Sequence, residues 1–289
     1  MALNVVVNIE EGAERSFFDG DRCNEGLVEV PRTVGAGVRD LAVESMYEYG
    51  SRAGVFRLLR LFDRMGVPVT AFAAAQALER NPDVAAGLAR SGHEVCAHGF
   101  RWAEAWRMTR EEEQASIRDA VRSLANSCGH RPVGWYSRWM PSVHTRELLV
   151  EDGGFIYDAD AYNDDFPYYT RTAGRWHLVV PYSLTYNDGA FSYGHMTSPS
   201  DFVDYCTRAL EYLLAEDDGA PRLMSIGLHP RISGQPARAA AVAEFLEHAR
   251  STDGVWIATR EAIARHWLSD HPPPGDDPDL VWQKQGATR

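Results

Sequence analysis

Short runs of apolar residues alternate along the chain with segments whose apolar residues recur at helical spacing. Residues 3–8 and 67–73 have the length and β-branched content of buried strands, and residues 50–65 place Val55, Leu58, Leu59 and Phe62 on one helical face. The same pattern predicts strands at residues 93–97, 133–135, 156–158, 177–180, 223–228 and 255–258. It predicts helices at residues 82–91, 109–127, 145–152, 198–216, 236–250 and 259–268.

Regular alternation of strands and helices is typical of α/β proteins with a parallel sheet or barrel. No linker composition interrupts it, so we expect one catalytic domain over residues 1–268. Residues 10–48 show no clear period, and a loop of that length inside a domain usually carries function. Residues 269–289 are rich in Pro and Asp without periodicity, which predicts a polar C-terminal tail.

Charge and composition narrow the possible partners and location. The net charge of −12 argues against nucleic acid and against an anionic membrane surface, because both need a basic face. The four cysteines lie far apart without a CxxC pair, which is typical of neither a zinc framework nor a disulfide scaffold. The first residues lack a basic segment before an apolar run, and no stretch is long enough for a membrane span. We therefore expect a cytoplasmic protein.

Polar residues with useful chemistry follow the predicted strands rather than preceding them. In a parallel barrel, the residues just past the carboxyl ends of the strands form the active site. Those found at such positions are Glu10, Glu11, His98, Arg138, Asp158, Asp160 and His229. Their convergence at one end of the predicted barrel indicates an active site.

His93 and His98 flank one predicted strand. Five extended residues would separate the two rings by roughly 16 Å, so they cannot share a metal ion. His93 lies at the start of that strand, where a structural role is expected, and His98 lies at the functional end.

Several segments together resemble a known family. Glu10-Glu11-Gly12, Gly92-His-Glu-Val-Cys-Ala-His98, Trp135-Tyr-Ser-Arg-Trp-Met-Pro141 and Ser225-Ile-Gly-Leu-His-Pro-Arg231 are similar to motifs of the polysaccharide deacetylase (NodB-homology) superfamily. The segments Gly154–Asp160, Pro181–Asp188 and Ile257–Trp267 further resemble its allantoinase-like branch. This likeness implies an α/β fold, a distorted (β/α)7 barrel, and a cofactor-independent ring amidohydrolase.

The resemblance also implies roles for individual residues. Glu10 takes the place of the general base and Glu11 that of a metal ligand. Arg138 would orient Glu10 or the substrate, and His229 would protonate the departing nitrogen. Substrate contacts are implied within residues 158–165, without a choice among the aspartates.

The metal site of the family is incomplete in this sequence. Trp102 stands four residues after His98, where the family has a second metal-binding histidine, and an indole cannot be a ligand. Glu11 and His98 supply two ligands, whereas a protein site needs at least three. Glu14 or Glu104 could supply a third, so a divalent metal such as zinc stays possible, but we expect none.

Without a Lewis acid, the site suits an electrophile better than a simple acetamide. We therefore predict a hydrolase of carbon–nitrogen bonds that opens a cyclic ureide or imide, with Glu10, Arg138 and His229 as catalytic residues. Residues expected to bind this small heterocyclic substrate are His98, Trp102, Trp135 and Asp160. The resemblance also implies a homo-oligomer, a tetramer or a dimer. The alternatives are a metal-dependent deacetylase of small N-acyl compounds or sugars, and a non-catalytic binding barrel.

Overall fold

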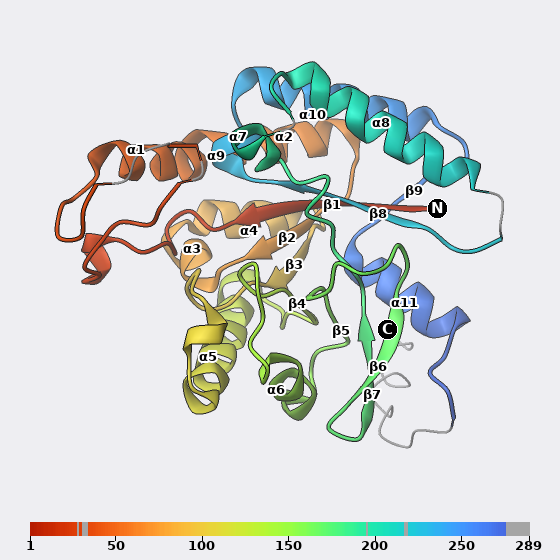
Figure 1. Ribbon diagram of the computed structural model, residues 1–289, viewed down its shortest axis with the longest axis horizontal. Coiled ribbons are helices and arrows are strands. Elements are labelled where there is room, and N and C mark those ends of the chain that lie inside the picture. Colours follow the sequence, from red (N-terminus) through yellow and green to blue (C-terminus); the bar gives the residue numbers. More distant parts are fainter. Residues whose placement is uncertain (28, 31–33, 195, 217–218, 276–289) are drawn as a thin grey trace.

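A curled, mostly parallel sheet lies at the centre of the molecule and helices cover its outer side, as the ribbon in Figure 1 shows. The computed structural model describes residues 1–27, 29–30, 34–194, 196–216 and 219–275. The strands are β1 (Ala2–Ile9), β2 (Thr70–Ala73), β3 (Glu94–Ala97), β4 (Gly134–Trp135), β5 (Tyr157–Asp158), β6 (Tyr168–Thr172), β7 (Arg175–Val179), β8 (Leu223–Leu228) and β9 (Trp256–Ile257).

The strand order is β6-β7-β5-β4-β3-β2-β1-β8, with β9 paired to the beginning of β1. Every pair is parallel except β6 with β7. A helix or a longer segment connects each parallel pair, as parallel strands require. This arrangement confirms the predicted α/β fold of the distorted-barrel type.

The helices follow the predicted periodic segments closely. They are α1 (Leu41–Tyr49), α2 (Val55–Met65), α3 (Ala75–Arg80), α4 (Pro82–Arg90), α5 (Arg110–Cys128), α6 (Thr145–Asp152), α7 (Ala190–Tyr193), α8 (Pro199–Ala215), α9 (Pro230–Ser233), α10 (Pro236–Ser251) and α11 (Arg260–Asp270). Short turns η1 (Phe17–Asp19) and η3 (Ala105–Arg107) are 3-10 helices, and the π-helical turn η2 (Gly50–Gly54) joins α1 to α2. In Figure 1, α8 and α10 run along the same side of the sheet. Among the described residues, no helix is both long and apolar enough to cross a membrane.

Several elements differ from the prediction. The segment 10–48 was expected to lack regular structure, but it contains η1 and most of α1, whose N-cap Asp40 accepts hydrogen bonds from the backbone of residues 42 and 43. Strand β6 and helix α3 were not predicted, because each is short and only partly apolar. Helix α11 continues to Asp270, past its expected end at residue 268, and residues 276–289 of the expected tail lie outside the described part of the chain.

The two-residue alternation of side chains along each strand decides what reaches the active site. On β1, Leu3, Val5 and Val7 pack toward the helices, whereas Val6 packs inside the curl of the sheet with Phe72 and Tyr157. Asn4 and Asn8 lie on the same inner side as Val6, and Glu10 continues this series just past the strand. His98 continues the inner series of β3 through Cys96, and His229 that of β8 through Ser225 and Gly227. Three predicted site residues are therefore directed toward one place.

Candidate active site

The buried carboxylate of Glu10 is the centre of the candidate site. Its Oε1 atom lies 3.6 Å from Nε2 of His98 and 3.5 Å from Nε2 of His229, and its Oε2 atom accepts a 3.1 Å hydrogen bond from Arg231. Burial raises the pKa of Glu10, but the neighbouring His229, His98 and Arg231 outweigh burial and hold it well below the ordinary value. Glu10 is therefore ionised at neutral pH.

His229 is held between two carboxylates. Its Nδ1 atom lies 2.6 Å from Oδ1 of Asp188, and its backbone N–H donates to Oδ2 of the same residue at 2.7 Å. The Ser233 hydroxyl donates to that Oδ2 at 2.7 Å, and Asp188 is fully buried. Burial lowers the pKa of His229, but Glu10 and Asp188 raise it to about 10. The resting histidine is thus an imidazolium whose Nε2 proton faces Glu10.

His98 has a fixed ring orientation. Its Nδ1 lies 2.7 Å from the carbonyl oxygen of Tyr136, which can only accept, so Nδ1 carries a hydrogen and Nε2 is directed at Glu10. The ring stacks on that of Tyr136, with centroids 5.1 Å apart and planes inclined by 11°. This packing leaves His98 one orientation beside the carboxylate.

Arg231 connects three carboxylates at the base of the site. Besides Glu10, its Nε donates to Glu29 at 3.0 Å, and its Nη1 lies 3.8 Å from Glu11. The guanidinium carbon also lies 5.4 Å from the centre of the Tyr47 ring. The sequence motif ending in Arg231 was recognised, but its arginine was not predicted to lie in the site.

Glu11 is buried beside Arg231. Its Oε1 accepts the backbone N–H of Arg231 at 3.1 Å and packs against Gly50, where a Cβ atom would lie 2.5 Å away. Burial raises its pKa to about 7, with Arg231 acting in the opposite direction and Glu10 adding to the rise. Glycine at position 50, the first residue of the π-helical turn, is what gives this carboxyl room.

A pocket of about 690 Å³ opens above these groups. Its polar end is lined by Asn8, Glu10, His98, Asn187, His229 and Arg231. Its remaining wall is lined by Gly26, Leu27, Trp102, Tyr136, Arg138, Trp139, Leu184, Gly189 and Ile232. Of the residues expected to bind substrate, His98 and Trp102 lie here.

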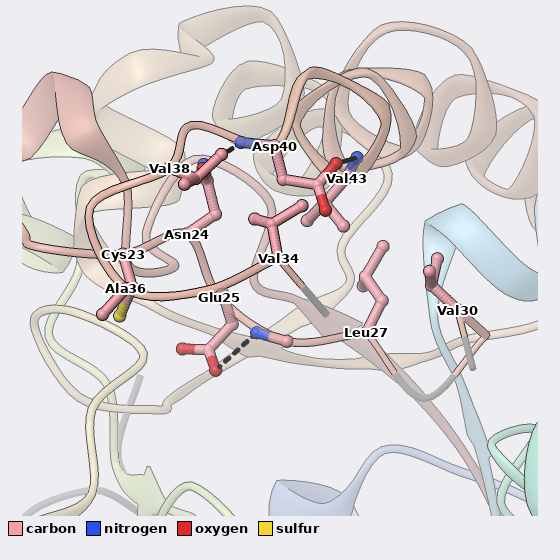
Figure 2. Close-up of a pocket in the computed structure, with 11 residues that line it drawn as sticks. Cys23, Asn24, Glu25, Leu27, Val30, Val34, Ala36, Val38, Asp40 and Val43 are labelled. Atoms are coloured by element: carbon pink, nitrogen blue, oxygen red, sulfur yellow. Dashed lines mark hydrogen bonds between the residues drawn. The ribbon is translucent and has the colours of Figure 1, made fainter. Parts of the chain in front are cut away.

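The loop before α1 forms part of this wall. Gly26 and Leu27 line both the main pocket and a smaller one of about 300 Å³, whose lining residues are drawn in Figure 2. In that view the Glu25 carboxylate turns back toward the Gly26 N–H, and Val34 and Val43 lie with Leu27 on the aliphatic side. The long segment that follows β1 therefore does reach the candidate site.

Arg138 does not contact Glu10, contrary to one of its two predicted roles. Its guanidinium forms two hydrogen-bonded contacts of 3.0 Å with the Glu25 carboxylate and lies 3.8 Å above the Trp102 ring. The arginine beside Glu10 is Arg231, which comes from the loop after β8 rather than the loop after β4. Since Arg138 lines the pocket, its other predicted role, orienting the substrate, stays a prediction.

Trp135 and Asp160 lie outside the pocket lining. Trp135 is buried against Phe155 on the helix side of the sheet, and its Nε1 donates to Ser137. Its neighbour Tyr136 faces the pocket instead, because adjacent residues of a strand point to opposite sides. Asp160 accepts from the backbone and the hydroxyl of Ser137, each at 2.7 Å. Both residues thus have contacts within the protein, and a substrate contact of either stays a prediction.

Asp158 is also part of the framework rather than of the pocket. It is fully buried and accepts two hydrogen bonds from Arg146, and Nε2 of His177 lies 3.0 Å away. Burial raises its pKa, but Arg146 and His177 outweigh burial and lower it. His93 has a structural setting too, with its ring edge-on to Phe62.

The donors near Glu10 do not fit a divalent metal. Within the described ranges, no group of three or more His, Cys, Asp or Glu side chains is arranged to hold one. Glu11 is engaged by the Arg231 backbone and faces Gly50, and Trp102 carries the Arg138 guanidinium on its ring. The positive charge next to Glu10 and Glu11 is supplied by Arg231 itself.

Comparison with known proteins identifies the family. The family model for polysaccharide deacetylases matches residues 37–140. A Schizosaccharomyces pombe protein assigned to the polysaccharide deacetylases is 36% identical, over 94% of this chain and 91% of its own length. The chain belongs to the polysaccharide deacetylase family.

Solved structures agree with this membership. A "probable polysaccharide deacetylase" from Pseudomonas aeruginosa PAO1 is 45% identical with a TM-score of 0.89, covering 94% of this chain and 92% of that one. The PuuE allantoinase is 43% identical with a TM-score of 0.89, covering 94% and 91%. As a member of this family, the protein is an enzyme that hydrolyses carbon–nitrogen bonds, which confirms the predicted class and disfavours a non-catalytic barrel.

Two functional residues escaped the sequence-based reasoning, although signals for them existed. Asp188 ends the segment Pro181–Asp188, which was noted only for its family likeness, and it follows no recognised strand. The structure brings it to His229 because the backbone N–H of Asp188 donates to the carbonyl of Gly227, which extends the edge of β8. Arg231 is two residues beyond His229 and reaches Glu10 because Pro230 begins the short helix α9 there.

Proposed function

We propose that this deacetylase-family enzyme opens a cyclic ureide or imide ring by hydrolysis, using Glu10 and His229 and no metal ion. The observation that carries the proposal is the arrangement of Glu10, whose free Oε1 faces two histidine rings at the polar end of a large pocket. The similarity to the PuuE allantoinase supports a ring substrate.

Glu10 and His229 would divide the proton transfers between them. Contacts of 3.5 and 3.6 Å are longer than ordinary hydrogen bonds, so a water molecule could bind to Oε1 and be directed by His98. As the water oxygen bonds to the ring carbonyl carbon, Glu10 accepts one water proton. His229, protonated at neutral pH, then gives its Nε2 proton to the ring nitrogen as the carbon–nitrogen bond breaks. The product is a single open-chain molecule that carries a new carboxyl group at one end and an amide or urea group at the other. The proton that Glu10 took from water replaces the one that His229 gave, across the 3.5 Å between Oε1 and Nε2.

A ring nitrogen between two carbonyl groups makes metal assistance less necessary. The second carbonyl withdraws electron density from the departing nitrogen, so the bond breaks more readily than that of a simple acetamide. The donor set around Glu10 supports this choice, because Arg231 provides the positive charge there and Glu11 is turned away from the pocket.

The test is hydrolysis of allantoin, hydantoin and succinimide by protein exhaustively treated with chelator. We expect turnover of at least one ring, unchanged by added zinc, and lost by on the order of 10²–10⁴-fold in Glu10→Gln and His229→Gln. His248→Gln, which changes a histidine on the outer surface of α10, is the matched control and should retain full activity. Turnover of N-acetyl sugars that needs added zinc, with no ring opened, would contradict the proposal and favour a metal-dependent deacetylase.

A further inference from the structure

Trp139 stands at the pocket wall in an unfavourable backbone conformation. Its φ is +60°, a region that bulky residues rarely adopt, and the Met140 N–H donates to the Arg138 carbonyl at 2.6 Å to close a tight turn around it. The side chain lines the pocket and yet is 67% exposed. A large apolar ring held in the open by a strained turn is not explained by packing of the core.

Neighbouring residues hold this turn from both sides. Tyr162 donates its hydroxyl to the Trp139 carbonyl at 2.8 Å and lies 3.0 Å from the hydroxyl of Tyr136, which lines the same pocket. On the other side, the buried Arg138 side chain is fixed by Glu25. Strained conformations persist where the surroundings over-determine them, and they concentrate at ligand sites. The contacts of Tyr162 and Glu25 thus hold the turn in the conformation that places the Trp139 ring at the pocket.

The pocket is larger than the ring that the polar end can process. A volume of about 690 Å³ falls in the range of ~300–1,000 Å³ that holds drug-sized ligands, and a bare five-membered ring fills only a small part of it. Beyond Glu10 and the histidines, the wall is formed by aromatic and aliphatic residues: Leu27, Trp102, Tyr136, Trp139, Leu184 and Ile232. Arg138 on this wall lies 3.0 Å from Glu25 and 3.7 Å from Glu104, so two carboxylates already face its guanidinium.

We propose that Trp139 forms a second part of the substrate site, which binds an uncharged, flat aromatic or apolar substituent carried by the ring that the enzyme opens. The proposal rests on the ring-opening function above and specifies its substrate class. The Trp139 indole supplies a face on which an aromatic group can stack, and Trp102, whose ring carries Arg138, adds apolar surface beside it. An anionic substituent would have to compete with Glu25 and Glu104 for the Arg138 guanidinium.

The test compares hydantoin with 5-benzylhydantoin for the wild type, Trp139→Ala, Trp139→Phe and Trp106→Ala. The wild type should show at least a tenfold higher kcat/KM for the benzyl compound, through a lower KM. Trp139→Ala should lose most of that preference through a higher KM for the benzyl compound, and circular dichroism checks that the variant is folded. Trp139→Phe should keep most of the preference because it keeps an aromatic face. Trp106, which is 41% exposed and does not line the pocket, is the matched control, and its replacement should change nothing.

The outcomes distinguish a failure of the role proposed for Trp139 from a failure of the proposed ring-opening function. Equal or better turnover of hydantoin by the wild type, or a preference that survives in Trp139→Ala, would overturn the role of Trp139 and leave ring opening intact. Failure to open any ring, with or without a substituent, would overturn the proposed function itself.

Discussion

Replacing Asp188 by Asn tests whether His229 acts as the acid. The variant keeps the size and shape of a fully buried side chain but removes the negative charge 2.6 Å from Nδ1 of His229. An ion pair at short range is worth on the order of 4 kcal/mol at an effective dielectric constant of ~20. Losing it would lower the pKa of His229 by roughly 3, at about 1.4 kcal/mol for each pKa unit.

The direction of the pH effect follows from the role of the residue. An acid catalyst is active while it is protonated, so the wild-type rate should persist on the alkaline side until the pH approaches about 10. In Asp188→Asn the alkaline limb should move to near neutrality. The loss in kcat should therefore be small at pH 6 and on the order of 10²-fold at pH 9.

The assay is kcat against pH from 5 to 10 on the best ring substrate, with circular dichroism to confirm the fold. Ser233→Ala is the matched control, because it removes only the hydroxyl that donates to the same carboxylate at 2.7 Å and keeps the charge. Its profile should stay close to that of the wild type. A uniform loss at every pH in Asp188→Asn, or an alkaline limb that does not move, would refute His229 as the proton donor.

Three further predictions concern charged side chains in and around the candidate site. Arg231→Lys should lower kcat by about 10- to 100-fold, because one ammonium cannot replace the charged hydrogen bonds to both Glu10 and Glu29. Glu29→Gln should lower kcat less, because it leaves the hydrogen bond between Arg231 and Glu10 in place. Steady-state kinetics measure both variants, and equal losses of kcat would contradict this reasoning. Arg138→Lys should raise KM several-fold with kcat nearly unchanged, since Arg138 contacts Glu25 and Trp102 rather than Glu10. A fall in kcat with KM unchanged would instead support the predicted role of Arg138 in orienting Glu10. Glu11→Gln should raise the free energy of unfolding at pH 9 by about 3 kcal/mol and leave it unchanged at pH 4, measured by urea unfolding. The sign follows because the pKa of Glu11 is raised from the ordinary glutamate value of 4.5 to about 7 in the folded state. The stability of the wild type therefore falls as the pH rises from 4.5 to 7, and a gain in stability of the variant at pH 4 would contradict the reasoning.

Sequence periodicity predicted the α/β class and most of the strands, and the family resemblance added the type of barrel. The strand at residues 223–228 was predicted with the bounds of β8, and the helix predicted over residues 109–127 is α5, with Thr109 as its N-cap. Glu10, His98 and His229 could be placed together because each follows a strand that pairs in parallel with a neighbour. What failed was the side to which a residue points when its strand is only two residues long. Trp135 was chosen and Tyr136 lines the pocket, and no period can be read from a two-residue strand.

Contacts between loops could not be read from the sequence, because they depend on the distance between segments far apart in the chain. Arg138 and Arg231 follow different strands, and both were compatible with an ion pair to Glu10. Two carboxylates in the segment before α1 separate them, because Glu25 holds Arg138 and Glu29 holds Arg231. That segment has no periodicity, so its fold over the site was beyond prediction even though its length suggested a function.

The same geometry explains why the ligand role implied for Glu11 does not carry over to this chain. Glu10 continues the inner series of β1, so the next residue is directed out of the curl, toward the helices. There Glu11 meets Gly50, and the backbone N–H of Arg231 takes its Oε1. Arg231 in turn places a permanent cation 3.1 Å from Glu10. A divalent ion added at this point would have to displace a guanidinium that already has three carboxylate neighbours, and Trp102 would give it no compensating ligand. The positive charge that keeps Glu10 ionised and oriented is therefore part of the polypeptide, and it should persist in chelator just as it does in zinc.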